Sequence, residues 1–312
     1  MRETLKTFAR QATDLLWRLT VYFALLIAAF WALSKGYSWA KNAFGVQFVS
    51  APGVRPAEAV ALGQLRLLIA ALFAWFVTAR LGRDRAASIM PLRANAIAHL
   101  LQGSLWGLAG IAATIGLIAW FGGYRVTGAA LSGAAFYYVP LWLVIALVNG
   151  AAENLAILGY PMCRIAKAAG WLPAVLVASA LFAAAHLGNP GESPIGIASV
   201  FLIALIMAVT IWLTGDLWLS VGIHAGLIIG EDLIFSVPDS GATYTGHLLV
   251  SRLAGPPWLS GGEGGPEASI VAFPVFLALL VLLWLVYRGD APAKPRAGFQ
   301  SATSSSGAGV RT

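Results

Sequence analysis

The chain has 312 residues, of which 59% are hydrophobic and 11% are charged, and its mean hydropathy is +0.79. A soluble globular domain carries about 25% charged residues, so this composition excludes an ordinary soluble protein and indicates a membrane protein. The formal net charge is +7, but the distribution of the basic residues along the chain argues for membrane topology and against nucleic acid as a partner.

Apolar runs recur along the whole chain, and several reach the roughly 20 residues needed to span a bilayer. Lipid offers no hydrogen bonds to the backbone, so each spanning run is expected to be a helix. The predicted fold is therefore all-α, a polytopic transmembrane helix bundle of about eight spans. In chain order the spans are approximately Leu16–Leu33, Val60–Thr78, His99–Phe121, Phe136–Ile157, Leu172–His186, Ile195–Leu213, Leu217–Phe235 and Ile270–Tyr287.

The basic residues predict the orientation of these spans. Fourteen of the 20 Lys and Arg residues fall on one side of the predicted bundle. Because cytoplasmic loops carry the excess of Lys and Arg, both termini are expected in the cytoplasm, in a bacterial-type plasma membrane. Residues 1–290 are expected to form the transmembrane domain, and residues 291–312, rich in Ser, Gly, Ala and Pro, a disordered cytoplasmic tail. The outward segment from Ser236 to Ser269 either covers the mouth of the bundle or only connects two spans.

Among the ionisable residues inside predicted spans, Glu153, His186 and His224 lie within continuous apolar runs. A charge at the bilayer centre costs at least roughly 2.5 kcal/mol, so such residues usually have a function. The fourth and fifth spans form a predicted hairpin with its turn at Ala168–Gly170, about midway between Glu153 and His186. All three side chains are therefore candidates to meet in one interior pocket.

The residues around these positions occur as three motifs in order. Residues Glu153–Gly159 read Glu-Asn-Leu-Ala-Ile-Leu-Gly, residues Phe182–His186 read Phe-Ala-Ala-Ala-His, and residues His224–Ile228 read His-Ala-Gly-Leu-Ile. This order resembles the CPBP family, which contains the CAAX proteases and bacteriocin-processing intramembrane proteases. The family carries Glu-Glu-x-x-x-Arg-Gly, then Phe-x-x-x-His, then His-x-x-x-Asn or Asp. The resemblance covers about residues 136–235.

The chain departs from the family pattern at three positions. Asn154 replaces the second Glu, Leu158 replaces the Arg, and Ile228 replaces the final Asn or Asp. Membership of the family therefore does not by itself establish activity.

The resemblance implies an intramembrane endopeptidase that cuts a membrane-associated protein or peptide. Glu153 and His186 would hold and activate a water molecule, and His224 would donate to the oxyanion. Loss of one oxyanion donor typically costs about 10²–10³ in turnover, so Ile228 predicts a slow enzyme or none if the family residue served there.

A metal site is an open alternative at the same three residues. Two His and one carboxylate can hold zinc with a position left for water, so Glu153, His186 and His224 are also candidate ligands for a divalent metal such as zinc. A metal-free Glu and His site is the preferred interpretation. Glu231 and Asp232, near the end of the seventh span, are expected to be interfacial.

Two other functions compete with proteolysis. The first is a catalytically impaired relative that acts as a membrane binding or immunity protein. The second is a transporter in which Glu153 and the two His form a proton relay. The only cysteine, Cys163, excludes an intramolecular disulfide and is expected to be a packed side chain.

Overall fold

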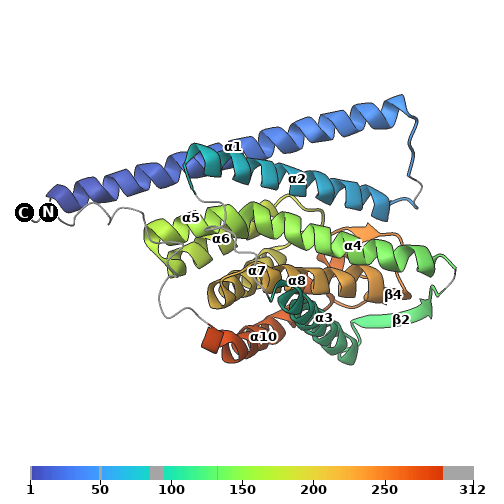
Figure 1. Cartoon of the computed structure of the whole chain (residues 1–312). Helices are drawn as coiled ribbons and strands as arrows, with labels where there is room; N and C mark the ends of the chain where they lie inside the picture. The colour runs from blue at the N-terminus through green and yellow to red at the C-terminus, as the bar shows by residue number, and fades with distance from the viewer. Residues whose placement is uncertain (1, 49–50, 85–94, 132, 291–312) are drawn as a thin grey trace, which may run out of the picture.

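The computed structural model describes residues 2–48, 51–84, 95–131 and 133–290 (Figure 1). The tail predicted at residues 291–312 lies outside this described part. The helices are α1 (Arg2–Ala43), α2 (Ala57–Leu81), α3 (Ala96–Trp120), α4 (Ala135–Glu153), α5 (Tyr160–Ala169), α6 (Trp171–Ala185), α7 (Pro194–Thr214), α8 (Trp218–Ile228), α9 (Pro257–Ser260) and α10 (Ala272–Tyr287). Two π-helical turns follow α4 and α8, namely η2 (Asn154–Gly159) and η3 (Ile229–Phe235). The described residues also form the short 3₁₀ turns η4 (Gly262–Gly264), η5 (Pro266–Ala268) and η6 (Arg288–Asp290).

The chain forms a helical membrane bundle. Within the described residues, six helical segments are long and apolar enough to cross a bilayer. The fifth and eighth predicted spans are also apolar helices, but α6 has 15 residues and α10 has 16. At 1.5 Å per residue each is about 22–24 Å long, which is less than the roughly 30 Å hydrocarbon core.

The helices are arranged in layers (Figure 1). The α1–α2 pair lies along one side of the long α4–α5 segment, and α3, α7, α8 and α10 lie on the other side. The outer pair exposes large apolar side chains such as Trp31 at 62% and Phe76 at 52%. In a membrane these side chains face lipid, whereas α7 and α8 are mostly enclosed by other helices.

Short strand pairs gather at one end of the bundle, opposite the turn between α5 and α6 (Figure 1). The strand β1 (Val54–Arg55) pairs in parallel with β3 (Thr243–Tyr244), so Arg55 lies beside Tyr244. The strand β2 (Tyr124–Ala129) pairs antiparallel with β4 (Leu249–Leu253), with a register shift between Val126 and Gly128. These pairs attach the segment Ser236–Ser269 to distant loops.

Local sequence signals set several helix ends. The α5–α6 turn falls at Gly170, whose φ of 90° suits glycine and few other residues. This confirms the predicted hairpin. Ser193 caps the start of α7 by accepting a hydrogen bond from Gly196 N at 3.0 Å, and Pro194 follows at the first helical position.

The backbone of α8 contacts the backbones of α3 and α4, because glycines lie at both contacts. On the α3 side, a Cβ on Gly222 would lie 2.9 Å from Gly103 Cα, and one on Gly226 would lie 2.7 Å from Leu108 N. On the α4 side, a Cβ on Gly150 would lie 2.8 Å from Val221 O. Small residues four apart allow this close packing in membranes. The contacts fix α8, and with it His224, between α3 and α4.

The π-helical turn η2 begins directly after Glu153. Pro161 lies at the start of α5, just beyond η2. Proline has no N–H to donate and its ring clashes with the carbonyl four residues earlier, here that of Ile157. A widened turn relieves that clash, and such turns often occur at functional sites. The long α4–α5 segment is therefore irregular next to the first motif.

Candidate active site

The side chains of Glu153, His186 and His224 converge although they come from three different helical segments. Glu153 Oε2 lies 4.0 Å from His186 Nε2 and 3.8 Å from His224 Nε2. All three side chains are largely buried, with 13–22% of their surface exposed. The meeting of these side chains in one interior pocket, inferred from the hairpin and the spans, agrees with the structure.

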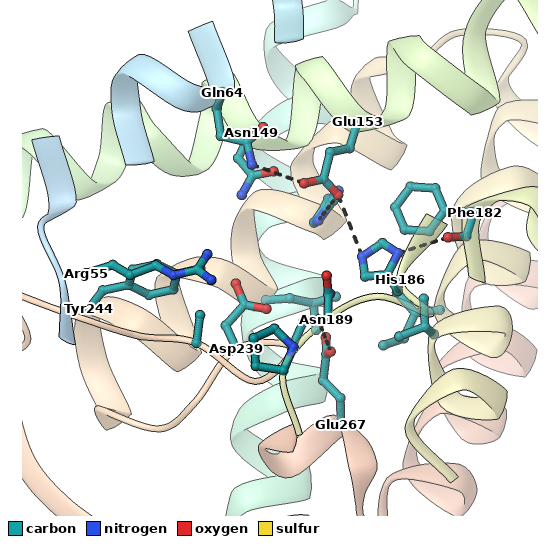
Figure 2. A pocket seen from close by; sticks show the side chains of 17 residues that line it. Arg55, Gln64, Asn149, Glu153, Phe182, His186, Asn189, Asp239, Tyr244 and Glu267 are labelled. Atoms are coloured by element: carbon teal, nitrogen blue, oxygen red, sulfur yellow. Dashed lines mark hydrogen bonds and ion pairs between the residues drawn. The ribbon is translucent and has the colours of Figure 1, made fainter. Parts of the chain in front are cut away.

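The two carboxylate oxygens of Glu153 have different surroundings. Gln64 of α2 donates from Nε2 to Glu153 Oε1 at 3.1 Å. The other oxygen, Oε2, faces the two imidazoles, and Figure 2 shows Glu153 directed toward His186. One oxygen is therefore held in place while the other is available to a bound molecule.

His186 is oriented by its own helix. Its Nδ1 lies 2.9 Å from the carbonyl oxygen of Phe182, one turn earlier. A carbonyl only accepts, so Nδ1 carries a proton and donates it. The ring also stacks on Phe182, with the centroids 5.1 Å apart. In a neutral His186 the lone pair is therefore on Nε2, the atom that faces Glu153.

His224 is oriented by Asn154, the residue at one of the degenerate motif positions. His224 Nδ1 lies 3.0 Å from Asn154 Oδ1, and Asn154 Nδ2 donates to Ser220 Oγ at 2.9 Å. In this arrangement the amide oxygen accepts from Nδ1–H, which leaves the lone pair of a neutral His224 on Nε2. Asn154 is fully buried, so it acts on His224 and does not line the pocket.

The other two degenerate positions lie in the hydrophobic core. Leu158 is fully buried in the largest apolar cluster, with Met162 and Phe182. Ile228 is 2% exposed and packs in a second cluster with Trp142 and Ile145. Neither lines the pocket around Glu153. Each replaces a polar side chain of the family with one that suits its apolar surroundings.

The pocket has a volume of about 180 Å³ and extends beyond the three motifs. Asn149, one turn before Glu153, lines it and is 8% exposed. Its Oδ1 is buried and has no hydrogen-bond partner among the described residues. Arg55 and Tyr244, which belong to the paired strands β1 and β3, form another part of the wall (Figure 2).

The segment Ser236–Ser269 covers one side of this pocket. Asp239, Ala242, Tyr244 and Glu267 all line it, and Figure 2 shows Asp239 and Glu267 below the Glu153–His186 pair. Of the two roles expected for this segment, a cover over the site is the one that the structure supports.

Glu231 and Asp232 are not interfacial, and that prediction was wrong. Glu231 is 1% exposed and Asp232 is 4% exposed. Both belong to the π-helical turn η3, and both lie close to Asp239 of the covering segment. Glu231, Asp239 and Glu267 each contribute a carboxylate oxygen to a group in which these atoms lie within 4.8 Å of one another.

Burial and mutual repulsion affect the carboxyl groups in the covering segment. Burial raises the pKa of Asp239 above its usual range. Burial, with the Asp239 charge beside it, raises the pKa of Glu267 to about 8. Protonation or a bound cation would relieve this repulsion.

The donor types of Glu153, His186 and His224 suit zinc, but their spacing does not. With zinc–ligand distances of about 2.1 Å, two ligands 4.0 Å apart would subtend about 145° at the metal, far from a tetrahedral angle. At a water molecule about 2.8 Å from both atoms, the two atoms would subtend an angle of about 90°, which suits two hydrogen bonds. In the described part of the chain, the set of three carboxyl, His or Cys residues whose ligand atoms all lie within 4.8 Å of one another is Glu231, Asp239 and Glu267. The spacing of the Glu and His set therefore favours a bridging water.

Comparison with known families identifies the central part of the chain. Residues 135–228 match the family model described as type II CAAX prenyl endopeptidase Rce1-like, which covers just under a third of the chain. Neither the curated proteins nor the solved structures that were compared gave a match. The matched residues include all three converging side chains and the complete helices from α4 to α8. Residues 135–228 are thus similar to the Rce1-like type II CAAX prenyl endopeptidases, a family of intramembrane proteases, and this match is consistent with the CPBP resemblance of the three motifs.

Proposed function

We propose that this protein is an intramembrane endopeptidase that hydrolyses a peptide bond in a membrane-associated protein or peptide. The observation that carries the proposal is one carboxylate oxygen of Glu153 within 4.0 Å of the Nε2 atoms of His186 and His224. These distances are too long for direct hydrogen bonds and leave room for a water molecule. The family match supports the class of reaction.

In the proposed reaction Glu153 is the general base. A water molecule donates one hydrogen to Glu153 Oε2 and the other to the lone pair of His186 Nε2. Its oxygen attacks the carbonyl carbon of the scissile peptide, and its proton passes to Glu153. The protonated Glu153 then delivers that proton to the amide nitrogen as the C–N bond breaks. The products are a carboxylic acid and an amine, and Glu153 returns to its carboxylate form.

Stabilisation of the oxyanion requires a donor, and Asn149 is the residue that we assign to it. A neutral His224 in the tautomer set by Asn154 offers a lone pair to the pocket and no N–H, so it donates only when protonated. Asn149 lines the same pocket one turn from Glu153. The amide nitrogen of Asn149 is a neutral donor that would compensate for Ile228.

The membrane bundle and the family match bear on the location and the substrate of the protein. The membrane bundle supports an integral membrane location, and the protease family suggests a peptide substrate. The excess of Lys and Arg on one side favours cytoplasmic termini in a bacterial-type plasma membrane. With that orientation the segment Ser236–Ser269 and the pocket beneath it are on the outer side.

A second candidate function is a catalytically impaired family member that binds a membrane protein or confers immunity. The packing of Leu158 and Ile228 in apolar clusters favours it, because neither position supplies a polar group to the site. The two functions make opposite predictions for Glu153. A binding protein would keep its biological function when this carboxylate is replaced.

The test is cleavage of a library of membrane-anchored peptides by the full chain in lipid. Glu153→Gln and His186→Ala are each expected to lower turnover at least about 100-fold, because general acid–base catalysis contributes about 10²–10⁴. Glu58→Gln and His247→Ala are the matched controls, since neither residue lines the pocket. If the wild type does not cut the library while an intact-motif relative does, the impaired alternative replaces the protease proposal.

A further inference from the structure

Three carboxylates of the described residues meet beside the proposed active site without forming an ion pair. Glu231 lies in η3, Asp239 in the covering segment and Glu267 in η5, and one oxygen from each lies within 4.8 Å of the others. Two oxygens bound to one Ca²⁺ at about 2.4 Å can be at most about 4.8 Å apart. Three oxygens that all lie 4.8 Å apart are about 2.8 Å from their common centre, so shifts of a few tenths of an ångström bring all three to about the Ca²⁺–oxygen distance.

Glu267 Oε2 accepts a hydrogen bond from Ser240 Oγ at 3.2 Å, but no ion pair neutralises the group. None of the ion pairs formed by the described residues involves Glu231, Asp239 or Glu267. Glu231 is 99% buried, since only 1% of its surface is exposed, and Glu267 is 8% exposed. Burying a carboxylate without a partner costs several kcal/mol, so a neutralising species is expected.

Unpaired oxygens at the site give a second, independent indication of a ligand. Glu231 Oε1 and Asp232 Oδ1 are both buried and have no hydrogen-bond partner among the described residues. Asp232 lies against Asp239, and the charges of Asp239 and Glu267 both act on it. Buried polar atoms normally have a partner, so these two oxygens point to a species that would bind between them.

We propose that Glu231, Asp239 and Glu267 bind one hard divalent cation of the Ca²⁺ class, with Asp232 beside them. The ligands are all oxygens, which suits Ca²⁺, Mg²⁺ or Mn²⁺ and disfavours zinc or copper. Three carboxylates from separate segments suit the flexible coordination of Ca²⁺ better than the strict octahedron of Mg²⁺.

The cation would fasten the covering segment to the bundle. Glu231 belongs to the helical span that carries His224, while Asp239 and Glu267 lie in the segment that lines the pocket. A cation held by all three joins the cover to the helix that positions one proposed catalytic residue. Its removal would loosen the wall of the pocket without removing a group from Glu153, His186 or His224.

The experiment measures cation binding directly, without relying on activity. The full chain in detergent micelles is stripped with a chelator, and binding of ⁴⁵Ca²⁺ is followed by equilibrium dialysis together with thermal unfolding. One Ca²⁺ per chain is expected. A Ca²⁺ concentration of about 100 times Kd should raise the ratio of folded to unfolded protein about 100-fold, which is about 2.7 kcal/mol.

The variants Glu231→Gln and Glu267→Gln should each weaken binding at least about tenfold, as expected when a charged ligand is lost. Glu263→Gln, an exposed acid of the same segment, should bind like the wild type. Replacement of Glu by Gln also removes a repulsive charge, so both site variants should fold. If one of them does not fold, Asp239→Asn serves as a further site variant. No stoichiometric binding of Ca²⁺, Mg²⁺ or Mn²⁺ at concentrations on the order of 10 mM would overturn the proposal, because even weak calcium modules bind below that level. Undiminished binding by the site variants would overturn it as well.

This proposal and the protease proposal can fail separately. Glu153→Gln removes the proposed general base but none of the three cation ligands, so it should bind Ca²⁺ as the wild type does. An inactive protein that still binds one cation would refute only the protease. A wild type that cleaves peptides equally well with chelator, and binds no cation, would refute only the cation site.

Discussion

The glycine contacts of α8 yield a prediction whose size can be worked from the structure. A Cβ at Gly222 would lie 2.9 Å from Gly103 Cα and 2.9 Å from Ser104 N, and closer still to the Leu100 carbonyl oxygen. Ordinary van der Waals contact begins at 3.4 Å, so Gly222→Ala requires α3 and α8 to separate by at least 0.5 Å. The opposing atoms are backbone, so no side chain can rotate away to relieve the contact.

The expected destabilisation by Gly222→Ala is about 1–3 kcal/mol, the usual cost of overpacking a tightly packed core. At about 2–4 °C per kcal/mol, thermal unfolding in detergent should begin about 2–12 °C lower. The same movement displaces His224, two residues along α8, relative to Glu153. A displacement of about 1 Å can cost about 100-fold in rate, so cleavage should fall more than stability alone explains.

The matched control is Gly116→Ala on the exposed face of α3. A Cβ there would meet nothing within 4 Å, and alanine is the better helix former by about 1 kcal/mol. This variant should therefore unfold at or above the wild-type temperature. If Gly222→Ala and Gly116→Ala unfold at the same temperature, the close α3–α8 approach does not determine the position of α8 and the reasoning fails.

Two further predictions concern the site and the opposite end of the bundle. Asn149→Ala should lower kcat about 10²–10³-fold with little change in KM, because an oxyanion donor acts in the transition state. A higher KM with an unchanged kcat, measured by steady-state kinetics, would contradict the assignment. Arg164→Met should lower stability by about 3–5 kcal/mol, since Arg164 contacts Asp84 at 3.0 Å and Asp14 at 2.9 Å in a largely buried ion-pair network. The exposed Lys167→Met is its control, and equal unfolding temperatures for the two variants would show that the network contributes little.

Much of the fold could be predicted because membrane helices are specified locally. Eight apolar runs predicted eight apolar helices, although α6 and α10 are shorter than a full span. The hairpin turn at Gly170 followed from its position between two apolar runs and is confirmed. The meeting of Glu153 and His186 followed from the same hairpin, because residues equidistant from a turn lie at similar depth.

Other parts of the site could not be predicted because they depend on contacts between distant segments. The burial of Glu231 depends on the segment Ser236–Ser269 folding back over η3, and no local pattern in that segment indicates where it lies. The Gln64–Glu153 hydrogen bond joins residues 89 positions apart. The glycines at positions 103, 107, 222 and 226 were a usable signal for the α3–α8 contact, since both helices carry glycines four residues apart.

The division of the pocket between two parts of the chain has a consequence for how its selectivity could change. The residues proposed for chemistry lie on α4, directly after α6 and on α8, within the matched residues, whereas Arg55, Tyr244 and much of the remaining wall lie outside residues 135–228. Exchange of β1, β3 and the covering segment would therefore alter the shape and charge that a peptide meets while the reacting groups keep their supports. Selectivity and reactivity can diverge independently in such an architecture, and a transplanted cover should transfer the preference of its donor.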